Sequence, residues 1–338
     1  MSIQSMTNTD TRDVQAVVEQ IAALTDAGCQ IVRCAVPDMA AASALKEIKK
    51  KIRIPLVADI HFDYRLALAA IESGVDKLRI NPGNMKPEDR SKVLLAAKER
   101  GIPIRAGINS GSVEKDLLEK HGGVTPEALV ESALRTIALF EEMDFANTVI
   151  SIKASDIRIN TQAHKLLVQS MDYPLHIGIT EAGAGQRGKV KSAMGMGALL
   201  ADDIGDTMRV SLTGDPVEEV LFAQEILRGM GMQEGAVNLV SCPTCGRTQV
   251  DLERIVNQIE RHLPPIEKKR REQGLPAITV AVMGCAVNGP GEAREADLGV
   301  ACGKEEGLLF QKGKSLYKVP EDQIITAMVA LLEGTVEK

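Results

Sequence analysis

The sequence predicts an α/β protein, a (β/α)8 barrel of the TIM type followed by a smaller α/β domain. Two observations carry this prediction. Short β-type runs alternate with amphipathic helical stretches from the N-terminus to about residue 230, and eight such units follow one another. The length of 338 residues also fits, because such a barrel commonly takes about 250 residues and leaves roughly 100 for a second domain. A doubly wound sheet is the alternative that the same alternation allows.

Eight strands and eight helices make up the expected barrel. The strands cover residues 2–6, 31–35, 56–60, 77–80, 104–108, 148–152, 175–179 and 207–212. The helices cover residues 13–27, 40–51, 65–73, 90–100, 126–143, 159–171, 188–201 and 216–229. Asp13 and Thr125 are suitable N-caps, and Gly101 and Gly229 are expected in the left-handed conformation at helix ends. Right-handed crossovers close such units into a ring.

The regular alternation of strands and helices changes after about residue 235. We place the domain boundary between residues 1–232 and 233–338. The second domain is expected to contain a helix at 250–262, a connector rich in proline and charge at 263–275, and a final helix at 321–332. Its strands are expected at residues 237–240, 277–282, 298–301, 307–311 and 315–319.

Composition excludes several classes of protein. Lys and Arg number 40 against 46 Asp and Glu, and the net charge of −6 argues against a nucleic-acid binder. No apolar run approaches the roughly 18 residues of a membrane span, and the start MSIQSMTNTDTRD does not resemble a signal peptide. We therefore expect a cytoplasmic protein with no membrane partner. Six cysteines are too few for a disulfide scaffold and indicate metal or redox chemistry.

Cations at the ends of five predicted strands form the first candidate site, because barrel chemistry takes place at that end. They are Arg33, Arg79, Arg105, Lys153 and Arg209. Like charges packed together are costly unless an anion lies between them, and arginine matches phosphate with two parallel hydrogen bonds. The pattern predicts a phosphorylated or diphosphorylated ligand. For any single arginine, a salt bridge at the barrel rim is the alternative.

Three further titratable groups belong to the same ring, namely Asp59, His61 and Glu181. Neighbouring cations are expected to keep both carboxylates ionised unless burial raises a pKa for acid catalysis. His61 would donate to a phosphate or orient Asp59, and a purely structural histidine is the alternative.

The cysteines form the second candidate site. Cys242 and Cys245 have the CxxC spacing that lets two thiolates bind one metal, and Cys285 follows within a glycine-rich run. The available fourth ligands are Cys302 and Glu292. Three cysteines with one weaker ligand favour an iron–sulfur cluster over a closed zinc site.

Several long motifs occur in a fixed order along the chain. They are SMTNT at residues 5–9, VADIHFD at 57–63, LRINPGN at 78–84, GITEAG at 178–183, RVSL at 209–212, CPTCGR at 242–247 and GCAVNGPGE at 284–292. Over essentially its whole length the chain resembles the bacterial 4-hydroxy-3-methylbut-2-enyl diphosphate synthase family, in its two-domain form. Members of that family usually carry a further segment before the first motif.

The resemblance implies a reaction and its partners. The reaction is the two-electron reductive ring opening and dehydration of 2-C-methyl-D-erythritol 2,4-cyclodiphosphate to 4-hydroxy-3-methylbut-2-enyl diphosphate, in non-mevalonate isoprenoid biosynthesis. It implies a substrate-binding barrel at 1–232 and an iron–sulfur domain at 233–338. Flavodoxin or ferredoxin would be the electron donor, and a head-to-tail homodimer would be the assembly.

The resemblance also implies roles for individual residues. A 4Fe–4S cluster would be held by Cys242, Cys245, Cys285 and Glu292, which leaves Cys302 as a structural thiol. Catalytic groups would be Glu181, Glu292, His61 and Asp59. The diphosphate-binding positions would be Arg33, Arg79, Arg105, Asn109, Lys153, Arg209 and Ser211.

Two other functions compete with this one. A phosphate-binding lyase or aldolase barrel could carry a zinc-held C-terminal module, and anaerobic purification would separate the two by colour. A non-enzymatic iron–sulfur carrier or RNA-binding module also uses CxxC motifs, but the ring of cations and the acidic net charge argue against it.

Overall fold

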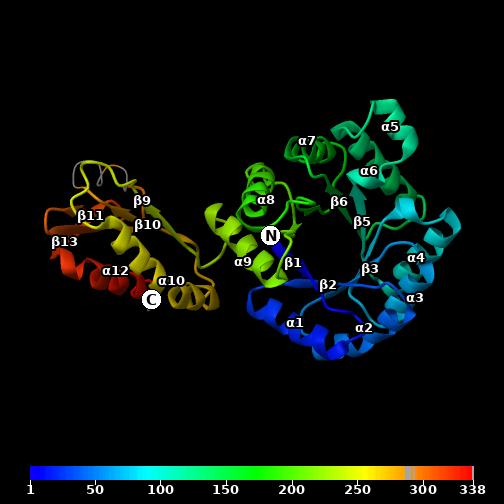
Figure 1. Ribbon diagram of the computed structural model, residues 1–338, viewed down its shortest axis with the longest axis horizontal. Helices are drawn as coiled ribbons and strands as arrows, with labels where there is room; N and C mark the ends of the chain where they lie inside the picture. Colours follow the sequence, from blue (N-terminus) through cyan, green and yellow to red (C-terminus); the bar gives the residue numbers. More distant parts are fainter. Residues whose placement is uncertain (286–290, 292–293, 337–338) are drawn as a thin grey trace. The chain divides into compact units, whose positions relative to one another are not determined.

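A computed structural model describes residues 1–285, 291 and 294–336 of the chain. It divides into two compact units, Met1–Ile226 and Leu227–Lys338, shown with the course of the chain in Figure 1. This division falls within helix α9 (Pro216–Gly229), whereas the sequence analysis placed the boundary after residue 232.

Unit 1 is a nearly closed barrel of eight parallel strands, which confirms the predicted fold class. The sheet order is β6-β5-β4-β3-β2-β1-β8-β7, and a bridge between Ile150 and Leu175 links its two ends. The Ile150 N–H donates to the Pro174 carbonyl at 2.9 Å across that seam. The strands are β1 (Ser2–Met6), β2 (Ile31–Ala35), β3 (Leu56–Ile60), β4 (Lys77–Ile80), β5 (Ile104–Asn109), β6 (Thr148–Lys153), β7 (His176–Ile177) and β8 (Thr207–Met208).

The last two barrel strands are shorter than predicted, since each has only two residues in the ladder. Just beyond this ladder the two segments approach each other closely at Gly178. A Cβ atom there would lie 2.6 Å from the Arg209 carbonyl oxygen, so the segments touch backbone to backbone. The Arg209 N–H donates to the Ile177 carbonyl at 3.1 Å, and the segments that follow form loops around the cavity described below.

Helices cover the outside of the strands (Figure 1). They are α1 (Val14–Asp26), α2 (Met39–Lys51), α3 (Tyr64–Glu72), α4 (Pro87–Arg100), α5 (Lys115–His121), α6 (Pro126–Glu141), α7 (Ile157–Leu167), α8 (Gly185–Leu200) and α9. Asp13 and Thr125 cap α1 and α6 as predicted, and Gly101 is left-handed with φ of 65°. The prediction for Gly229 is wrong, because α9 includes it and the left-handed residue is Gly231. The sequence analysis missed α5.

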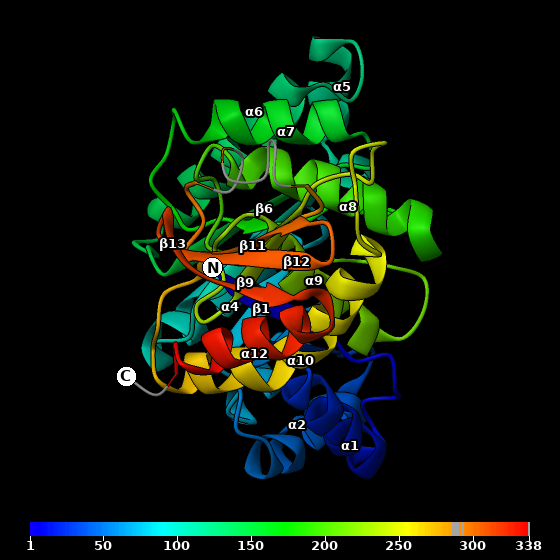
Figure 2. The same cartoon turned by 90° about the vertical axis from the view of Figure 1, so that its left-hand side faces the viewer.

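Unit 2 contains a five-stranded mixed sheet, and two helices of its described residues pack against one face of that sheet. The sheet order is β13-β12-β11-β10-β9, and its parallel part joins β9 (Val237–Ser241), β10 (Ile278–Met283) and β11 (Leu298–Gly303). The antiparallel part adds β12 (Glu306–Gln311) and β13 (Lys314–Pro320). Helices α10 (Leu252–Glu272) and α12 (Ile324–Glu333) lie side by side on the sheet (Figure 2) and bury an apolar core with it.

The predicted connector at 263–275 is wrong, because α10 continues through Pro264 and Pro265 to Glu272. Ile259, Leu263 and Ile266 extend one buried face of this helix. Burial of that face against the sheet outweighs the roughly 3 kcal/mol by which an interior proline disfavours a helix. None of the helices in the described parts of the chain is long and apolar enough to cross a membrane.

Candidate active site

A cavity of about 110 Å³ in the barrel is lined by all seven side chains that were predicted to bind a diphosphate. They are Arg33, Arg79, Arg105, Asn109, Lys153, Arg209 and Ser211. Ser151 and Thr180 complete the lining. The structure therefore brings together residues from six strands or strand ends, while their function as ligands of a substrate stays a prediction.

The strand register explains why these side chains meet. Asp59 lies opposite Arg79, and Arg79 lies opposite Arg105, so the three form one row across β3, β4 and β5. Asn109 lies opposite Lys153 in the next pair of strands. Residues that are directly opposite in a ladder point to the same side of the sheet, which here is the barrel interior.

Two glycines make room for the cations. A Cβ atom at Gly107 would lie 2.9 Å from the Arg79 Nε, and one at Gly178 would lie 3.0 Å from the Lys153 Nζ. Real Cβ atoms do not approach other atoms so closely, so the bare backbone at these positions lets both long side chains reach the cavity.

Carboxylates neutralise part of the positive charge. Asp59 pairs with Arg79 at 3.1 Å and lies 3.9 Å from Arg33, and Glu219 pairs with Arg209 at 3.3 Å. Three of the arginines therefore form salt bridges, which was the alternative to ligand binding for any single arginine. Five cations line the cavity and two carboxylates pair with them, which leaves an excess of three positive charges among the described residues.

The remaining two cations have different surroundings. Arg105 is 2% exposed, and its Nη1 donates to the Gln4 Oε1 at 2.7 Å, a neutral acceptor on the opposite side of the barrel. Its Nε is buried without a hydrogen-bond partner. In the described part of the chain, no carboxylate forms an ion pair with Arg105 or Lys153. These two groups carry the charge that an anion could neutralise.

Burial and mutual repulsion perturb the pKa values of the cavity residues. Burial lowers the pKa of Arg33 to about 10. Burial also lowers the pKa values of Arg105 and Lys153 well below their ordinary values. The charges of neighbouring arginines lower all three pKa values further. Burial alone would raise the pKa of Asp59, but the Arg33 charge, the His61 hydrogen bond and the Arg79 charge together hold it below its usual range. An anion in the cavity would relieve this repulsion.

The three predicted catalytic groups of the barrel occupy different places. The His61 Nε2 lies 3.2 Å from the Asp59 Oδ2 and 3.3 Å from the Arg79 Nη1. Asp59 is buried behind the arginines, whereas the His61 side chain is half exposed. Glu181 is exposed, in the turn after β7, and has a left-handed backbone with φ of 53°. A left-handed backbone is uncommon for glutamate, and it fixes the direction in which the Glu181 side chain leaves the main chain.

Some residues of the cavity were missed by the sequence analysis. Ser151 precedes Lys153 by two residues on β6, so the alternation of strand side chains could have identified it. Thr180 follows the short strand β7. Glu219 lies on a helix, and no pattern in the sequence connects it with Arg209.

Two of the predicted cluster ligands, Cys242 and Cys285, follow neighbouring strands at one end of the sheet in unit 2. Because β9 and β10 are parallel neighbours, Cys242 and the segment before Cys285 leave the sheet side by side. The Gly284 N–H donates to the Cys242 Sγ at 3.2 Å. Cys285 is buried and Cys245 is exposed. Glu292, the predicted fourth ligand, lies outside the described residues.

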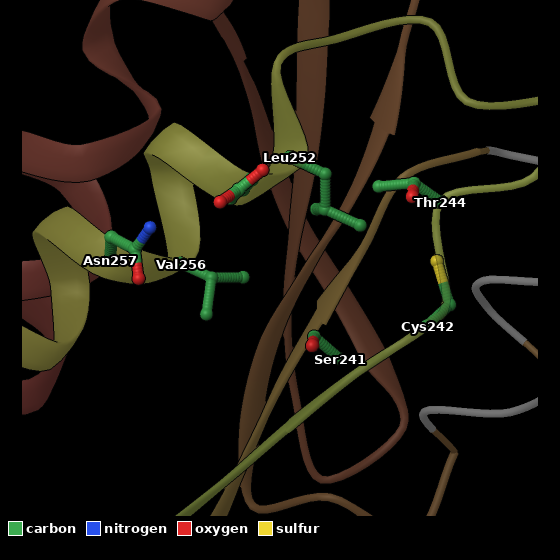
Figure 3. A pocket seen from close by; sticks show the side chains of 7 residues that line it. Ser241, Cys242, Thr244, Leu252, Val256 and Asn257 are labelled. Atoms are coloured by element: carbon green, nitrogen blue, oxygen red, sulfur yellow. The ribbon is translucent and has the colours of Figure 1, made fainter.

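Cys242 also borders a cavity of about 250 Å³, whose other walls come from Ser241, Thr244 and the first turns of α10 (Figure 3). Within the described ranges no group of three or more His, Cys, Asp or Glu side chains is arranged to bind a metal ion. A cavity thus lies beside Cys242, while the assignment of cluster ligands stays a prediction.

Cys302 differs from the other predicted ligand candidates. It is fully buried in the apolar core of unit 2, and burial, followed by the charges of Glu321 and Cys242, raises the pKa of its thiol to about 12. A small thiol packed among apolar side chains on strand β11 is typical of a structural cysteine. This supports the prediction that Cys302 is structural.

Two family models match the chain. The model described as the GcpE TIM-barrel domain matches residues 1–224, and the model described as the GcpE protein C-terminal domain matches residues 238–334. The "4-hydroxy-3-methylbut-2-en-1-yl diphosphate synthase (flavodoxin)" of Clostridium perfringens is 54% identical over 98% of this chain and 93% of that protein. The protein of the same name from Geobacillus kaustophilus is 55% identical over 99% of this chain and 88% of that protein.

Among solved structures, the dihydropteroate synthase of Yersinia pestis matches with a TM-score of 0.46 and 12% identity, over 67% of this chain and 90% of that chain. The two family models together span both units, and the identity to the two relatives extends over nearly the whole chain. The chain therefore belongs to the GcpE family of 4-hydroxy-3-methylbut-2-en-1-yl diphosphate synthases.

Proposed function

We propose that the barrel cavity holds the diphosphate group of 2-C-methyl-D-erythritol 2,4-cyclodiphosphate during the reaction of this family, its reduction to 4-hydroxy-3-methylbut-2-enyl diphosphate. The excess of cations over carboxylates in one cavity is the observation that carries this proposal. Opening the ring frees a bridging phosphate oxygen and adds negative charge to the diphosphate. The charges of Arg105 and Lys153 would stabilise that product.

The iron–sulfur part of the proposal places a 4Fe–4S cluster on Cys242, Cys245, Cys285 and Glu292. The donor set fits such a cluster, with three thiolates and one weaker carboxylate ligand. The hydrogen bond from the Gly284 N–H to the Cys242 Sγ supports this assignment, because hydrogen bonds to cluster sulfurs tune the potential. When bound, the cluster supplies electrons for breaking the carbon–oxygen bond.

The remaining polar groups would orient the substrate and handle protons. Asp59 stays ionised and holds Arg79 and His61 in place, so its part is to position them. The departing hydroxyl must accept a proton to leave as water. Glu181, with its exposed carboxylate at the end of β7, is the group that we assign to this transfer.

The proposed partners follow the family. The names of the relatives include flavodoxin, and we propose flavodoxin or ferredoxin as the electron donor in the cytoplasm. We further propose a head-to-tail homodimer in which the cluster domain of each chain serves the barrel of its partner. Mixing a Cys285→Ser chain with an Arg105→Ala chain tests this arrangement. Activity regained by proven heterodimers supports it, and a mixture as inactive as both parents would show that one chain builds the whole site.

The function itself is tested on protein purified without oxygen. Iron and sulfide content, the visible spectrum and product formation are measured with reduced flavodoxin, before and after adding the cyclic diphosphate. A brown protein whose spectrum changes on addition and which forms the product is expected. A colourless zinc protein that makes no product would instead favour the lyase or aldolase alternative.

A further inference from the structure

Glu219 is a buried carboxylate that none of the roles described so far requires. It lies in the first turn of α9 and is 4% exposed. Acidic side chains are almost never fully buried unless they are paired. Glu219 accepts hydrogen bonds from the Arg209 Nη2 at 3.3 Å and Nε at 3.4 Å, and its Oε1 accepts from the Leu212 N–H at 2.9 Å.

These contacts hold the segment that carries two cavity residues. The β8 ladder ends at Met208, and Arg209 and Ser211 lie just beyond it. The backbone bond from Arg209 to Ile177 anchors the start of this segment, and a bond from the Thr213 N–H to the Gly183 carbonyl anchors its end. Between these anchors, Glu219 fixes the backbone at Leu212, which directly follows Ser211.

Glu219 also supplies the strongest acceptors for the Arg209 side chain. The other acceptor in the described contacts of this guanidinium is the Met6 Sδ, 3.7 Å from Nη1, and a thioether sulfur is a weak acceptor. A side chain held by two carboxylate contacts loses less freedom when it binds a ligand than one held by sulfur alone.

A carboxylate in this place has an electrostatic disadvantage for anion binding, since it cancels one positive charge beside the cavity. Any benefit to binding must then come from geometry. Resting on the proposed function, we propose that Glu219 is a positioning residue, which holds Arg209 and the turn at 209–212 so that Arg209 and Ser211 meet the diphosphate in one fixed arrangement.

The test compares Glu219→Gln with Glu218→Gln in the cluster-loaded full-length chain. Glutamine keeps an acceptor for the Leu212 N–H but places an amide N–H against the Arg209 guanidinium. Glu218 is a matched control from the same turn, because it is exposed and pairs with Lys189 at 3.1 Å. The dissociation constant of the cyclic diphosphate is measured by calorimetry, with KM, kcat and the unfolding midpoint alongside.

For Glu219→Gln we expect the dissociation constant and KM to rise about tenfold while kcat changes less than about twofold, and Glu218→Gln should match the parent. Tighter binding by Glu219→Gln would show that the carboxylate acts only through its charge. Unchanged binding with a lower unfolding midpoint would show a merely structural role. Either result overturns the proposal.

A double-mutant cycle shows whether Glu219 acts through Arg209. In an Arg209→Ala background, adding Glu219→Gln should not weaken binding of the cyclic diphosphate any further, because the partner that it orients has gone. An undiminished tenfold loss in that background would contradict the proposal. A parent chain that does not bind the cyclic diphosphate at all would instead refute the proposed function, so the two failures are distinguishable.

Discussion

The barrel cavity and the cysteine region of unit 2 are built in different ways. The cavity residues lie on or directly after parallel strands, so the ladder register sets their positions and buried partners hold them. The cysteines lie in segments that follow strands, where the Gly284 N–H bond to Cys242 joins two of these segments. A site built on strands is positioned more precisely than a site built on loops, so the barrel cavity is the more rigidly held of the two.

The largest effect is expected from Cys285→Ser, which should lose both the bound iron and all activity. Cys302→Ser is the matched control, because that thiol is buried in the apolar core of unit 2. Iron content, visible absorbance and turnover measure both variants. A cluster lost from Cys302→Ser and kept by Cys285→Ser would reverse the ligand assignment.

Glu292→Ala should have the next largest effect, the loss of most activity with most of the iron retained. A carboxylate is a hard ligand in a soft site and contributes less than a thiolate to holding the cluster. The same iron and activity measurements apply. An active Glu292→Ala enzyme would show that this carboxylate is not needed.

In the barrel, Arg105→Ala should weaken binding of the cyclic diphosphate by about 2–4 kcal/mol, because it removes a buried charge that forms no ion pair with a carboxylate in the described part of the chain. Arg65→Ala is a suitable control, since that exposed side chain pairs only locally with Asp63. Because Arg105 lies among like charges, we expect no fall in the unfolding midpoint. Affinity within about twofold of the parent would show that the cavity is not the diphosphate site.

The smallest effect is a pH dependence of binding through Lys153. Burial and the charges of Arg105, Arg209, Arg33 and Arg79 lower its pKa in the free protein, whereas a bound diphosphate favours the charged amine. At a pH above that lowered pKa, binding should therefore take up a proton, and affinity should fall as the pH rises through it. Calorimetry in buffers of different ionisation heat measures the proton uptake. The Lys153→Arg variant should bind the cyclic diphosphate without taking up a proton. Equal proton uptake by the variant and the parent would show that Lys153 is not the group that accepts the proton.

Much of the fold could be predicted because each barrel unit repeats a local pattern. Strands β1 to β4 begin and end at the predicted residues. The errors occur where a distant contact decides the outcome. Helix α10 passes through Pro264 and Pro265 because one of its faces is buried on the sheet. Strands β7 and β8 have only two residues each in the ladder, although their sequences predict longer strands.

The sequence by itself determined which cations face the cavity. Strand side chains alternate with a period of two, so a cation near the end of a parallel barrel strand points inward wherever the pattern is read correctly. The gathering of Arg33, Arg105 and Lys153 in one cavity follows from that rule.

Only the tertiary structure decided how those charges are partnered. Asp59 reaches Arg79 across a neighbouring strand, Gln4 reaches Arg105 from the opposite side of the barrel, and Glu219 reaches Arg209 from a helix. Ion pairs and hydrogen bonds depend on distances of a few ångströms between groups far apart in the chain. Local sequence patterns contain no information on such distances, because these distances are set only when the ring of strands closes and the helices pack around it.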